Sequence, residues 1–440
     1  MGSRAVAELA ATPGVKLVTI VGRTEAALER AREHALEAQE RSRKRSLTAQ
    51  YGVREQAATA QKPVLTHTLA AREAARGHAA AVAAGPADEE APAAQAPGLE
   101  QAPANGGLAA PSARIELEVA DARNRDAVVD VMQRHDVALG ALGPFYIFEE
   151  PMVEAAIAAR TPYVSLCDDA DAAASALKHD GAARAAGVTV LTGLGWTPGL
   201  TNVLALRAAA VLDKTTAVTI AWAGSGAESG GTAVALHTLH IFDGKVATFA
   251  GGRLAHVPAG AEPEYVEFPP PLGRVQVCHV GHPEPLTLPA RLPGVRAVAL
   301  KGGLVEPTLH HLAVLTGRLG LGRTHGMRAF LARVLVPLIP ALSRLGPRRP
   351  AISGVVVRVT GEKDGRAVTV QSAATAPMRD LTSIPLVVGA LWMAQGRIKR
   401  PGVLAPDAPG LLPPDEFLAE LARRGLPVTH SELPGPGMPP

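Results

Sequence analysis

Aromatic residues are scarce in this sequence, and long uncharged hydrophobic runs are absent. Phe, Trp and Tyr make up 3% of the 440 residues, so binding surfaces rich in stacking rings are not expected. Charged and proline residues interrupt the most apolar stretch, 330–345, and its uncharged run is too short to span a bilayer. We interpret this stretch as a buried or interfacial helix pair, with membrane contact as the less favoured alternative.

Neither sign of charge dominates, and cysteine is rare. The chain has 44 Lys and Arg against 41 Asp and Glu, a balance that argues against nucleic-acid binding and favours a small-molecule ligand. Two distant cysteines, Cys167 and Cys278, exclude a disulfide framework and fit a reducing compartment. Residues 1–9 lack the apolar core of a signal peptide, so we expect a cytoplasmic protein.

Short apolar strands alternate with helices in much of the first half of the chain. This order predicts an α/β fold, a Rossmann doubly wound parallel sheet, with ligands at the carboxyl ends of its strands. The predicted strands are 15–21, 114–119, 136–142, 163–166 and 188–191. The predicted helices are 2–11, 24–45, 125–134, 150–159 and 172–186.

Composition divides the rest of the chain. Residues 46–112 are punctuated by proline and almost lack large apolar residues, so we expect a disordered insertion within a first domain of 1–198. Longer, alternating strands then predict a mixed α+β C-terminal domain over 199–376, and helices and a tail over 377–440. The strands expected in this second domain are 218–222, 234–242, 246–249, 275–280 and 354–360.

The first strands and helices suggest a dinucleotide site. Glycines between the first strand and helix let a pyrophosphate approach the helix N-terminus, and Gly2 and Ser3 occupy the end of such a loop. The strand and the two glycines that should precede Gly2 are missing, so we expect Met1 to be an internal methionine of a longer gene. Arg23 and Thr24 follow the next strand, where an arginine suits the 2′-phosphate of NADP, although NAD is also compatible.

Two further strand ends complete the predicted cofactor site. Asp121 could accept a hydrogen bond from adenine, and Gly143, Pro144 and Phe145 could line the nicotinamide half. An ordinary turn is the alternative explanation for the second group.

Several segments resemble the saccharopine dehydrogenase-like NAD(P)-dependent oxidoreductases, a family that includes saccharopine reductase, lysine 6-dehydrogenase and carboxynorspermidine reductase. These segments are GALGPF at 140–145, YVSLCDD at 163–169, GLGWTPGLTN at 193–202, GHPEPLTLP at 281–289 and GVLAP at 402–406. The resemblance implies a Rossmann domain followed by a mixed-sheet domain, a homodimer, and hydride transfer at a carbon–nitrogen bond. It leaves the substrate and the direction of the reaction open.

The resemblance points to residues that could manage the proton on nitrogen. Cys167 and Asp168, at a strand end, and His282, in the second domain, are the catalytic candidates. For Cys167 and Asp168, a buried thiol beside a structural turn is the competing explanation.

Substrate contacts are predicted at a helix start and in a loop. Thr201 and Asn202 could bind a carboxylate, or the turn before them could serve only to start the helix. Glu284 could reach the same cleft together with His282, and a local turn pair is the alternative.

We expect no metal site and no serine hydrolase site. His237 and His240 are three apart on a predicted strand, which would point them to opposite faces. No G-x-S-x-G elbow precedes a suitable helix. The leading prediction is an NADP-dependent reductase acting on a C–N bond of an amino-acid-like substrate. The alternatives are a non-catalytic or truncated family member that binds no cofactor, and a reductase of a lipid-like substrate.

Overall fold

The structure is a computed structural model that describes residues 2–22, 25, 28–33, 36–37, 113–228, 231–345, 347 and 349–435. The predicted insertion at 46–112 lies outside them, as do Arg23, Thr24 and much of the predicted helix 24–45.

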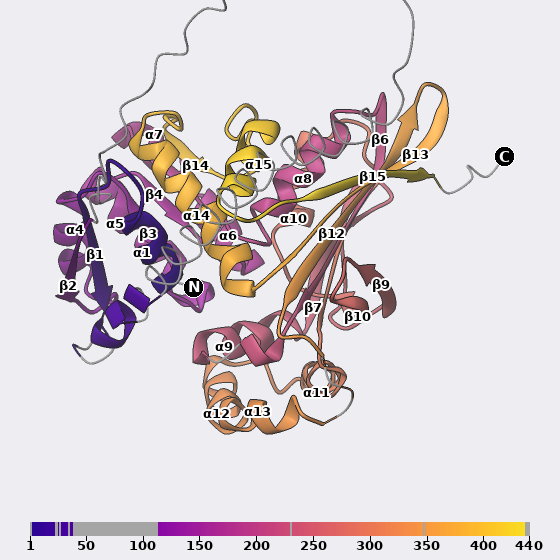
Figure 1. The fold of residues 1–440 in the computed structure, drawn as a ribbon, viewed down its shortest axis with the longest axis horizontal. Helices are drawn as coiled ribbons and strands as arrows, with labels where there is room; N and C mark the ends of the chain where they lie inside the picture. Colours follow the sequence, from indigo (N-terminus) through magenta and orange to yellow (C-terminus); the bar gives the residue numbers. More distant parts are fainter. Residues whose placement is uncertain are drawn as a thin grey trace, which may run out of the picture.

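Four short parallel strands form a sheet in the first domain, in the spatial order β14–β5–β4–β3 (Figure 1). Every residue of β4 and β5 is buried, because helices cover both faces of a parallel sheet. The predicted helix 172–186 is two helices that meet at Lys178 and His179. The elements are β3 Ala138–Gly140, β4 Tyr163–Ser165, β5 Thr189–Leu191, β14 Gly402–Leu404, α4 Arg125–Gln133, α5 Phe145–Ala159, α6 Ala170–Leu177 and α7 Asp180–Ala186.

A second, two-stranded parallel sheet lies beside the first but does not pair with it. Strand β1, Leu17–Gly22, pairs with β2, Arg114–Val119, and neither is hydrogen-bonded to β3. Helix α1, Gly2–Ala10, precedes β1 and packs on α14, Met378–Ala394, where Arg4 Nε lies 2.8 Å from Asp380 Oδ1. Within the described residues the doubly wound sheet is therefore interrupted between β1 and β3.

The second domain is built on a nine-stranded mixed sheet. Its main path is β15–β13–β12–β6–β11–β10–β9, and β7 joins β8 to β11. Strands β6 and β11 are parallel, and the other pairs are antiparallel. The strands are β6 Lys214–Gly224, β7 Lys245–Ala250, β8 Arg253–Pro258, β9 Glu264–Phe268, β10 Gly273–His279, β11 Ala297–Leu304, β12 Ser353–Lys363, β13 Arg366–Ala376 and β15 Thr429–Pro434.

Helices gather at one end of the mixed sheet, at the bottom of Figure 1, and we call them the helical cap. The cap consists of α9 Thr232–Ile241, α11 Pro307–Arg318, α12 His325–Leu335, the 3-10 turn η3 Val336–Leu338 and α13 Ile339–Leu342. Among the described helices, residues 325–342 alone are long and apolar enough to cross a membrane, and 11% of this stretch is buried. Of the two expected alternatives, a buried or an interfacial helix pair, the buried one is therefore wrong.

The C-terminal segment belongs to both domains. Helix α14 packs against the parallel sheet, and β14 adds its outer strand beside β5. Helix α15, Pro414–Arg423, packs on α14 and on α8, Leu200–Ala209, before β15 pairs with β13 in the mixed sheet. The predicted fold class, a Rossmann-type α/β domain with a mixed α+β domain, is confirmed.

One predicted strand, 234–242, is the helix α9. The segment is rich in apolar residues without a clear period, which is compatible with a buried strand or a buried helix. Leu236 and Leu239 form one face and pack on Ala332 of α12, a spacing that suits a helix. The hydroxyl of Thr238 also donates to the carbonyl of Val234 one turn earlier, at 2.9 Å.

The contact between α11 and the end of α9 allows no side chain at Gly317. A Cβ added there would lie 1.8 Å from the carbonyl oxygen of Phe242. We expect Gly317→Ala to lower the free energy of unfolding by about 2 kcal/mol in urea titrations, because backbone must move. Gly326→Ala in α12, where a Cβ meets nothing within 4 Å, is the control and should be neutral or slightly stabilising. Equal stability of the two variants would contradict this packing.

Candidate active site

Two consecutive carboxylates after strand β4 meet a histidine from the helical cap. Asp169 is fully buried at the start of α6, and its Oδ1 lies 2.7 Å from Nδ1 of His237. Asp168, whose side chain is 29% exposed, places Oδ1 3.3 Å from the same nitrogen. His237 is itself 15% exposed. This Asp–His cluster joins the two domains at the carboxyl end of a parallel strand, where ligands bind in such folds.

Burial and mutual attraction set the charges of the Asp–His cluster. Burial lowers the pKa of His237, but the two carboxylates outweigh it and raise the pKa to about 9. Burial raises the pKa of Asp168 to about 7, against the attraction of His237. Burial also acts to raise the pKa of Asp169, yet His237 holds it below its ordinary value. At neutral pH His237 is therefore a protonated imidazole and Asp169 is a carboxylate, while Asp168 can gain or lose its proton.

His282 reaches this cluster from the loop after β10. Its ring centroid lies 5.5 Å from that of His237, edge to face. Neither ring nitrogen has a hydrogen-bond partner among the described residues. Burial, together with the charge on His237, lowers the pKa of His282 to about 3, so the ring is neutral at physiological pH.

Glu284 begins the short helix α10, Glu284–Thr287, and is fully buried. Its Oε1 accepts hydrogen bonds from the hydroxyls of Thr197 at 2.6 Å and Thr201 at 2.7 Å. Burial raises the pKa of Glu284 to about 7 despite these donors. Asp168 and Glu284 are therefore two carboxyl groups that can gain or lose a proton near neutrality.

The GWTPG segment at 195–199 is a tight turn that starts α8. Gly199 has φ of 113°, and a Cβ there would lie 2.4 Å from the backbone nitrogen of Gly195. The side chain of Asn202 accepts from the Gly199 backbone N–H at 2.9 Å and donates to Asp407 at 3.2 Å. Asn202 thus has structural partners inside the protein, and its predicted role in substrate binding stays a prediction.

Cys167 is adjacent to Asp168 in sequence but points elsewhere. It is completely buried, with Sγ 3.8 Å from the carbonyl oxygen of Asp169, and burial raises the pKa of the thiol well above its ordinary value. A buried neutral thiol suits packing better than proton transfer. The structure brings Asp168 and His282 close to His237, joins Thr201 to Glu284 by a hydrogen bond, and leaves Cys167 in the core.

The predicted cofactor residues lie on neighbouring loops. Gly2 starts α1, and a Cβ on it would be 3.8 Å from that of Ala141, just after β3. A Cβ on Gly143 would be 3.4 Å from that of Ala233 in the cap. Pro144 and Phe145 begin α5, and Phe145 is buried. Ser3 follows Gly2 in α1 and is partly buried.

Asp121, after β2, is already engaged by a neighbour. Its carboxylate accepts from the backbone and the guanidinium of Arg123, at 2.7 to 3.1 Å. Adenine would have to share or displace this arginine.

Sequence reasoning missed His237 and the residues that fasten the cap. Because α9 is a helix, His237 and His240 lie on one side, and His240 Nε2 is 3.2 Å from Asp171 Oδ1. Arg328 of α12 contacts His240 and lies over the ring of Tyr146, 4.3 Å from its centroid. Histidines at helical spacing were the available signal, but they were assigned to a strand.

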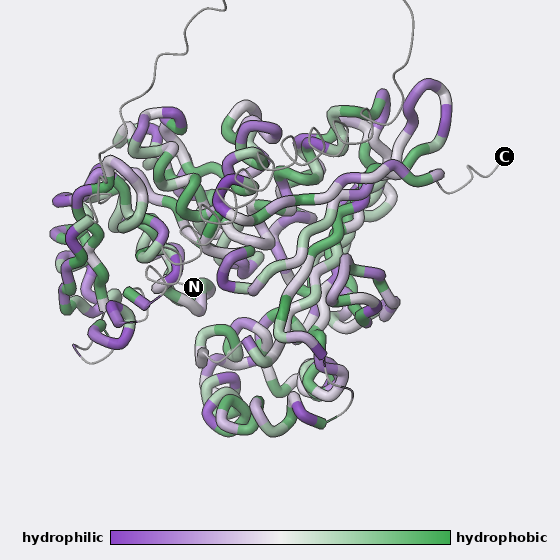
Figure 2. The backbone as a smooth tube through the Cα atoms, viewed as in Figure 1, coloured by the Kyte–Doolittle hydropathy of each residue, from purple (hydrophilic) through white to green (hydrophobic). Residues whose placement is uncertain are grey.

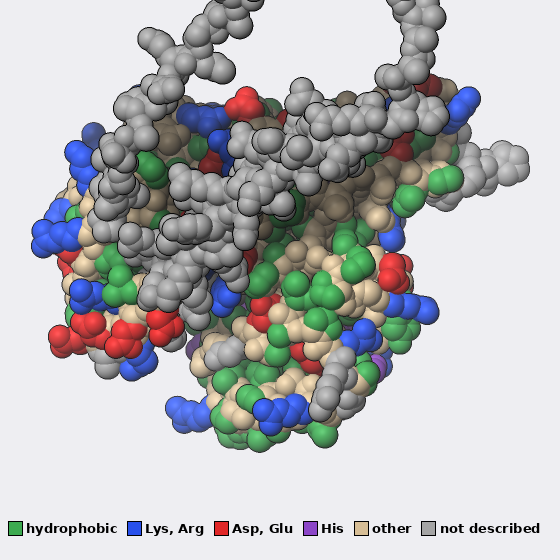
Figure 3. Space-filling view, viewed as in Figure 1, with side chains coloured by type: hydrophobic (Ala, Val, Ile, Leu, Met, Phe, Trp, Pro, Cys, Tyr) green, Lys and Arg blue, Asp and Glu red, His purple; other side chains and the backbone are tan. Residues whose placement is uncertain are grey.

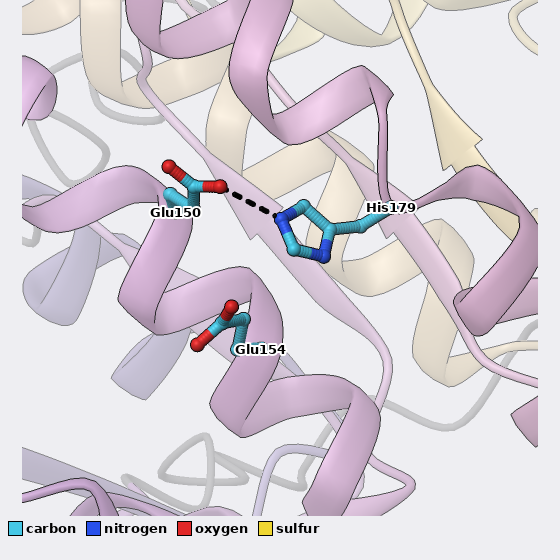
Figure 4. Close-up of side chains that lie close together, drawn as sticks. All are labelled: Glu150, Glu154 and His179. Carbon is cyan, nitrogen blue, oxygen red and sulfur yellow. Dashed lines mark hydrogen bonds and ion pairs between the residues drawn. The ribbon is translucent and has the colours of Figure 1, made fainter.

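Two described groups have the spacing of metal ligands. Ligand atoms of Asp168, Asp169 and His237 lie within 4.8 Å of one another, so the strand-based argument against a metal is wrong for His237. The second group, Glu150, Glu154 and His179, is largely exposed (Figure 4). There His179 Nε2 lies 2.9 Å from Glu150, which lowers the pKa of that carboxylate. Ordinary surface pairing accounts for the second group.

By sequence, the chain matches no protein-family model and no curated protein. By structure, it is similar to apo saccharopine dehydrogenase (L-Glu forming) from Saccharomyces cerevisiae, with 14% identity, a TM-score of 0.52, and 72% of this chain and 89% of that one covered.

A second similar structure, amine dehydrogenase from Mycobacterium smegmatis, has 11% identity, a TM-score of 0.33, and coverage of 68% and 82%. GenD2 from gentamicin A biosynthesis, in complex with NAD, has 13% identity, a TM-score of 0.29, and coverage of 72% and 83%. The chain therefore shares the two-domain fold of the yeast saccharopine dehydrogenase.

Proposed function

We propose that the protein is an oxidoreductase that transfers a hydride between NADP(H) and a C–N bond of an amino-acid-like substrate. The Asp–His cluster carries this proposal, because it places a protonated imidazole and an exchangeable carboxyl group between the two domains. Imine reduction adds a hydride to carbon and a proton to nitrogen, so the protein must supply the proton. The fold and the resemblance of the segment at 193–202 support this chemistry over others.

The described residues fit a dinucleotide in part. Helix α1 begins beside Ala141, so its free N–H groups lie at the carboxyl end of the parallel sheet, where a pyrophosphate binds favourably. Gly2 and Ser3 would hold the phosphates, and the loop at 143–145 would line the nicotinamide. When bound, NADP(H) supplies or accepts the hydride.

The protein's own residues would then handle the proton. Nδ1 of His237 is held by the two carboxylates, which leaves Nε2 for proton transfer to or from the substrate nitrogen. Asp169 keeps the imidazole charged and oriented, and Asp168 can return the proton from solvent. Glu284, whose charge acts on Asp168 and which accepts a hydrogen bond from Thr201, would suit an ammonium or amide group of the substrate.

A cofactor titration tests the proposal without a known substrate. We expect NADPH fluorescence to change on binding, with a dissociation constant below about 1 mM and about ten-fold tighter than for NADH. Arg23→Asp should remove the preference for NADPH, whereas Arg160→Asp, on an exposed turn, should not.

Absence of binding by both nucleotides at about 1 mM would support a non-catalytic protein instead. A screen of amine and carbonyl pairs with NADPH oxidation as readout would follow a positive titration.

A lipid-like substrate is the second candidate, and one cavity favours it. A hollow of about 600 Å³, which includes space open to solvent, lies between α9 and the other cap helices. Its lining is almost entirely aliphatic, including Val234, Leu239, Leu309 and Ile339. Since α9 also carries His237, a substrate whose apolar chain filled this hollow would have its reacting group close to the Asp–His cluster.

A further inference from the structure

Helix α12 is apolar on two faces, and the protein covers one of them. Its inner face packs Ala329, Ala332 and the following Val336 against α9. The other face carries a stripe of exposed side chains at helical spacing. These are Met327, Phe330, Val334 and Leu338, which are 43%, 62%, 46% and 47% exposed.

The stripe belongs to a larger exposed surface. Leu315 and Leu319, at the end of α11, and Leu345, after α13, are also more than half exposed. We call these residues and the stripe the apolar face of the cap. Figure 2 shows strongly hydrophobic segments at this lower end of the molecule. Large exposed apolar side chains gathered on neighbouring cap helices mark an interaction site in a folded protein.

The segment that carries the apolar face has charges of one sign. No Asp or Glu occurs between Glu306 and Glu362. Five arginines in this interval are exposed and form no ion pair with a described carboxylate; they are Arg318, Arg323, Arg333, Arg344 and Arg349. Figure 3 shows basic and hydrophobic side chains together over the lower cap. Unpaired arginines beside apolar side chains suit an anionic lipid surface.

The same helices are poorly suited to crossing a bilayer. Pro337 and Pro340 interrupt the helical stretch, and Arg333 lies at its centre. Arg328 is buried against Tyr146 of the first domain, which holds α12 to the rest of the protein. The cap can therefore lie on a membrane while its inner face stays packed.

We propose that the apolar face of the cap binds an anionic lipid bilayer. The stripe inserts among the lipid headgroups, and the arginines contact the negative charges of those headgroups. This contact is independent of the reaction proposed above. A second copy of the chain fits less well, because pairing two apolar faces would bring the unpaired arginines of both copies together.

Vesicle sedimentation tests the proposal with the full chain. We expect the protein to bind vesicles of phosphatidylglycerol and phosphatidylcholine, and to bind pure phosphatidylcholine at least about ten-fold more weakly. Binding should weaken in about 0.5 M salt, which screens the arginines. Val334→Asp and Arg333→Glu should each reduce binding about ten-fold or more. Val211→Asp and Arg366→Glu, exposed positions far from the cap in sequence, are the matched controls and should bind like wild type.

A fluorescent label reports on insertion directly. Both natural cysteines are buried, so a Phe330→Cys variant can be labelled selectively with an environment-sensitive fluorophore. The label should shift to the blue on anionic vesicles and be quenched by brominated lipids, whereas a label at Val211→Cys should respond to neither. Unchanged thermal melting would show that each variant is folded.

Three results would overturn the proposal. The first is no binding of the wild-type protein to anionic vesicles, and the second is equal binding of the cap variants and the controls. The third is a wild-type dimer that Val334→Asp converts to a monomer in analytical ultracentrifugation without any vesicle binding. That last result would assign the apolar face to self-association.

Discussion

Replacing His237 with Asn is expected to lower turnover of an imine substrate by about 10²- to 10⁴-fold, the usual contribution of a positioned acid. The variant keeps a polar side chain of similar volume but has no proton to give at neutral pH. Because the pKa of His237 is about 9, the wild-type rate of reduction should fall as the pH rises through that value. Steady-state NADPH oxidation across the pH range measures both effects.

The matched control for this experiment is His240→Asn. His240 lies one turn along α9 and also contacts a carboxylate, Asp171, but that carboxylate is 60% exposed. We expect this variant to retain activity within a few-fold. A His237→Asn enzyme that is folded and as active as the control would show that the Asp–His cluster is structural.

The stability of the protein should fall by about 3 kcal/mol between pH 6.5 and 9 through His237 alone. The folded-state pKa of about 9 lies above the unfolded value of 6.5, so the folded state binds the extra proton. This stabilisation is complete below pH 6.5 and is lost as the pH rises through 9. Urea unfolding at several pH values measures the slope.

The other carboxyl groups can be separated from this effect by their pH range. Asp168 and Glu284 have folded-state pKa values of about 7, so their part of the loss is complete near that pH. The slope above pH 7 therefore belongs mainly to His237. His237→Asn should flatten it, and a slope that persists in the variant would contradict the raised pKa.

Sequence periodicity sufficed for much of the parallel-sheet domain. Strand β2 was predicted with its observed bounds, because RIELEV lies between a proline-rich segment and an aspartate. Buried strands such as β4 were found from runs of apolar residues bounded by turn residues. In these segments local pattern and tertiary environment favour the same structure.

The candidate site could be predicted only in part, because the helical structure of α9 and the pairing of Asp169 with His237 depend on tertiary packing. Asp168, His282 and Glu284 were found from recognisable segments, whereas His237 was assigned to a strand. The apolar residues of 234–242 show neither a clear helical nor a clear strand period, and the packing of Leu236 and Leu239 on α12 selects a helix. The pairing of Asp169 with His237, 68 residues away in sequence, carries no local signal.

The route of the chain also constrains how the two domains can move. Backbone crosses between them before β6, again between β13 and α14, and a third time between α15 and β15. Three covalent connections favour a hinge motion over a shear motion, since they permit rotation of one domain about the line that joins them and resist sliding of the domains past each other. The contact between His237 and Asp169 then holds the two domains in the closed arrangement. Opening the two domains toward a ligand requires the contact between His237 and Asp169 to break while the three connections bend together.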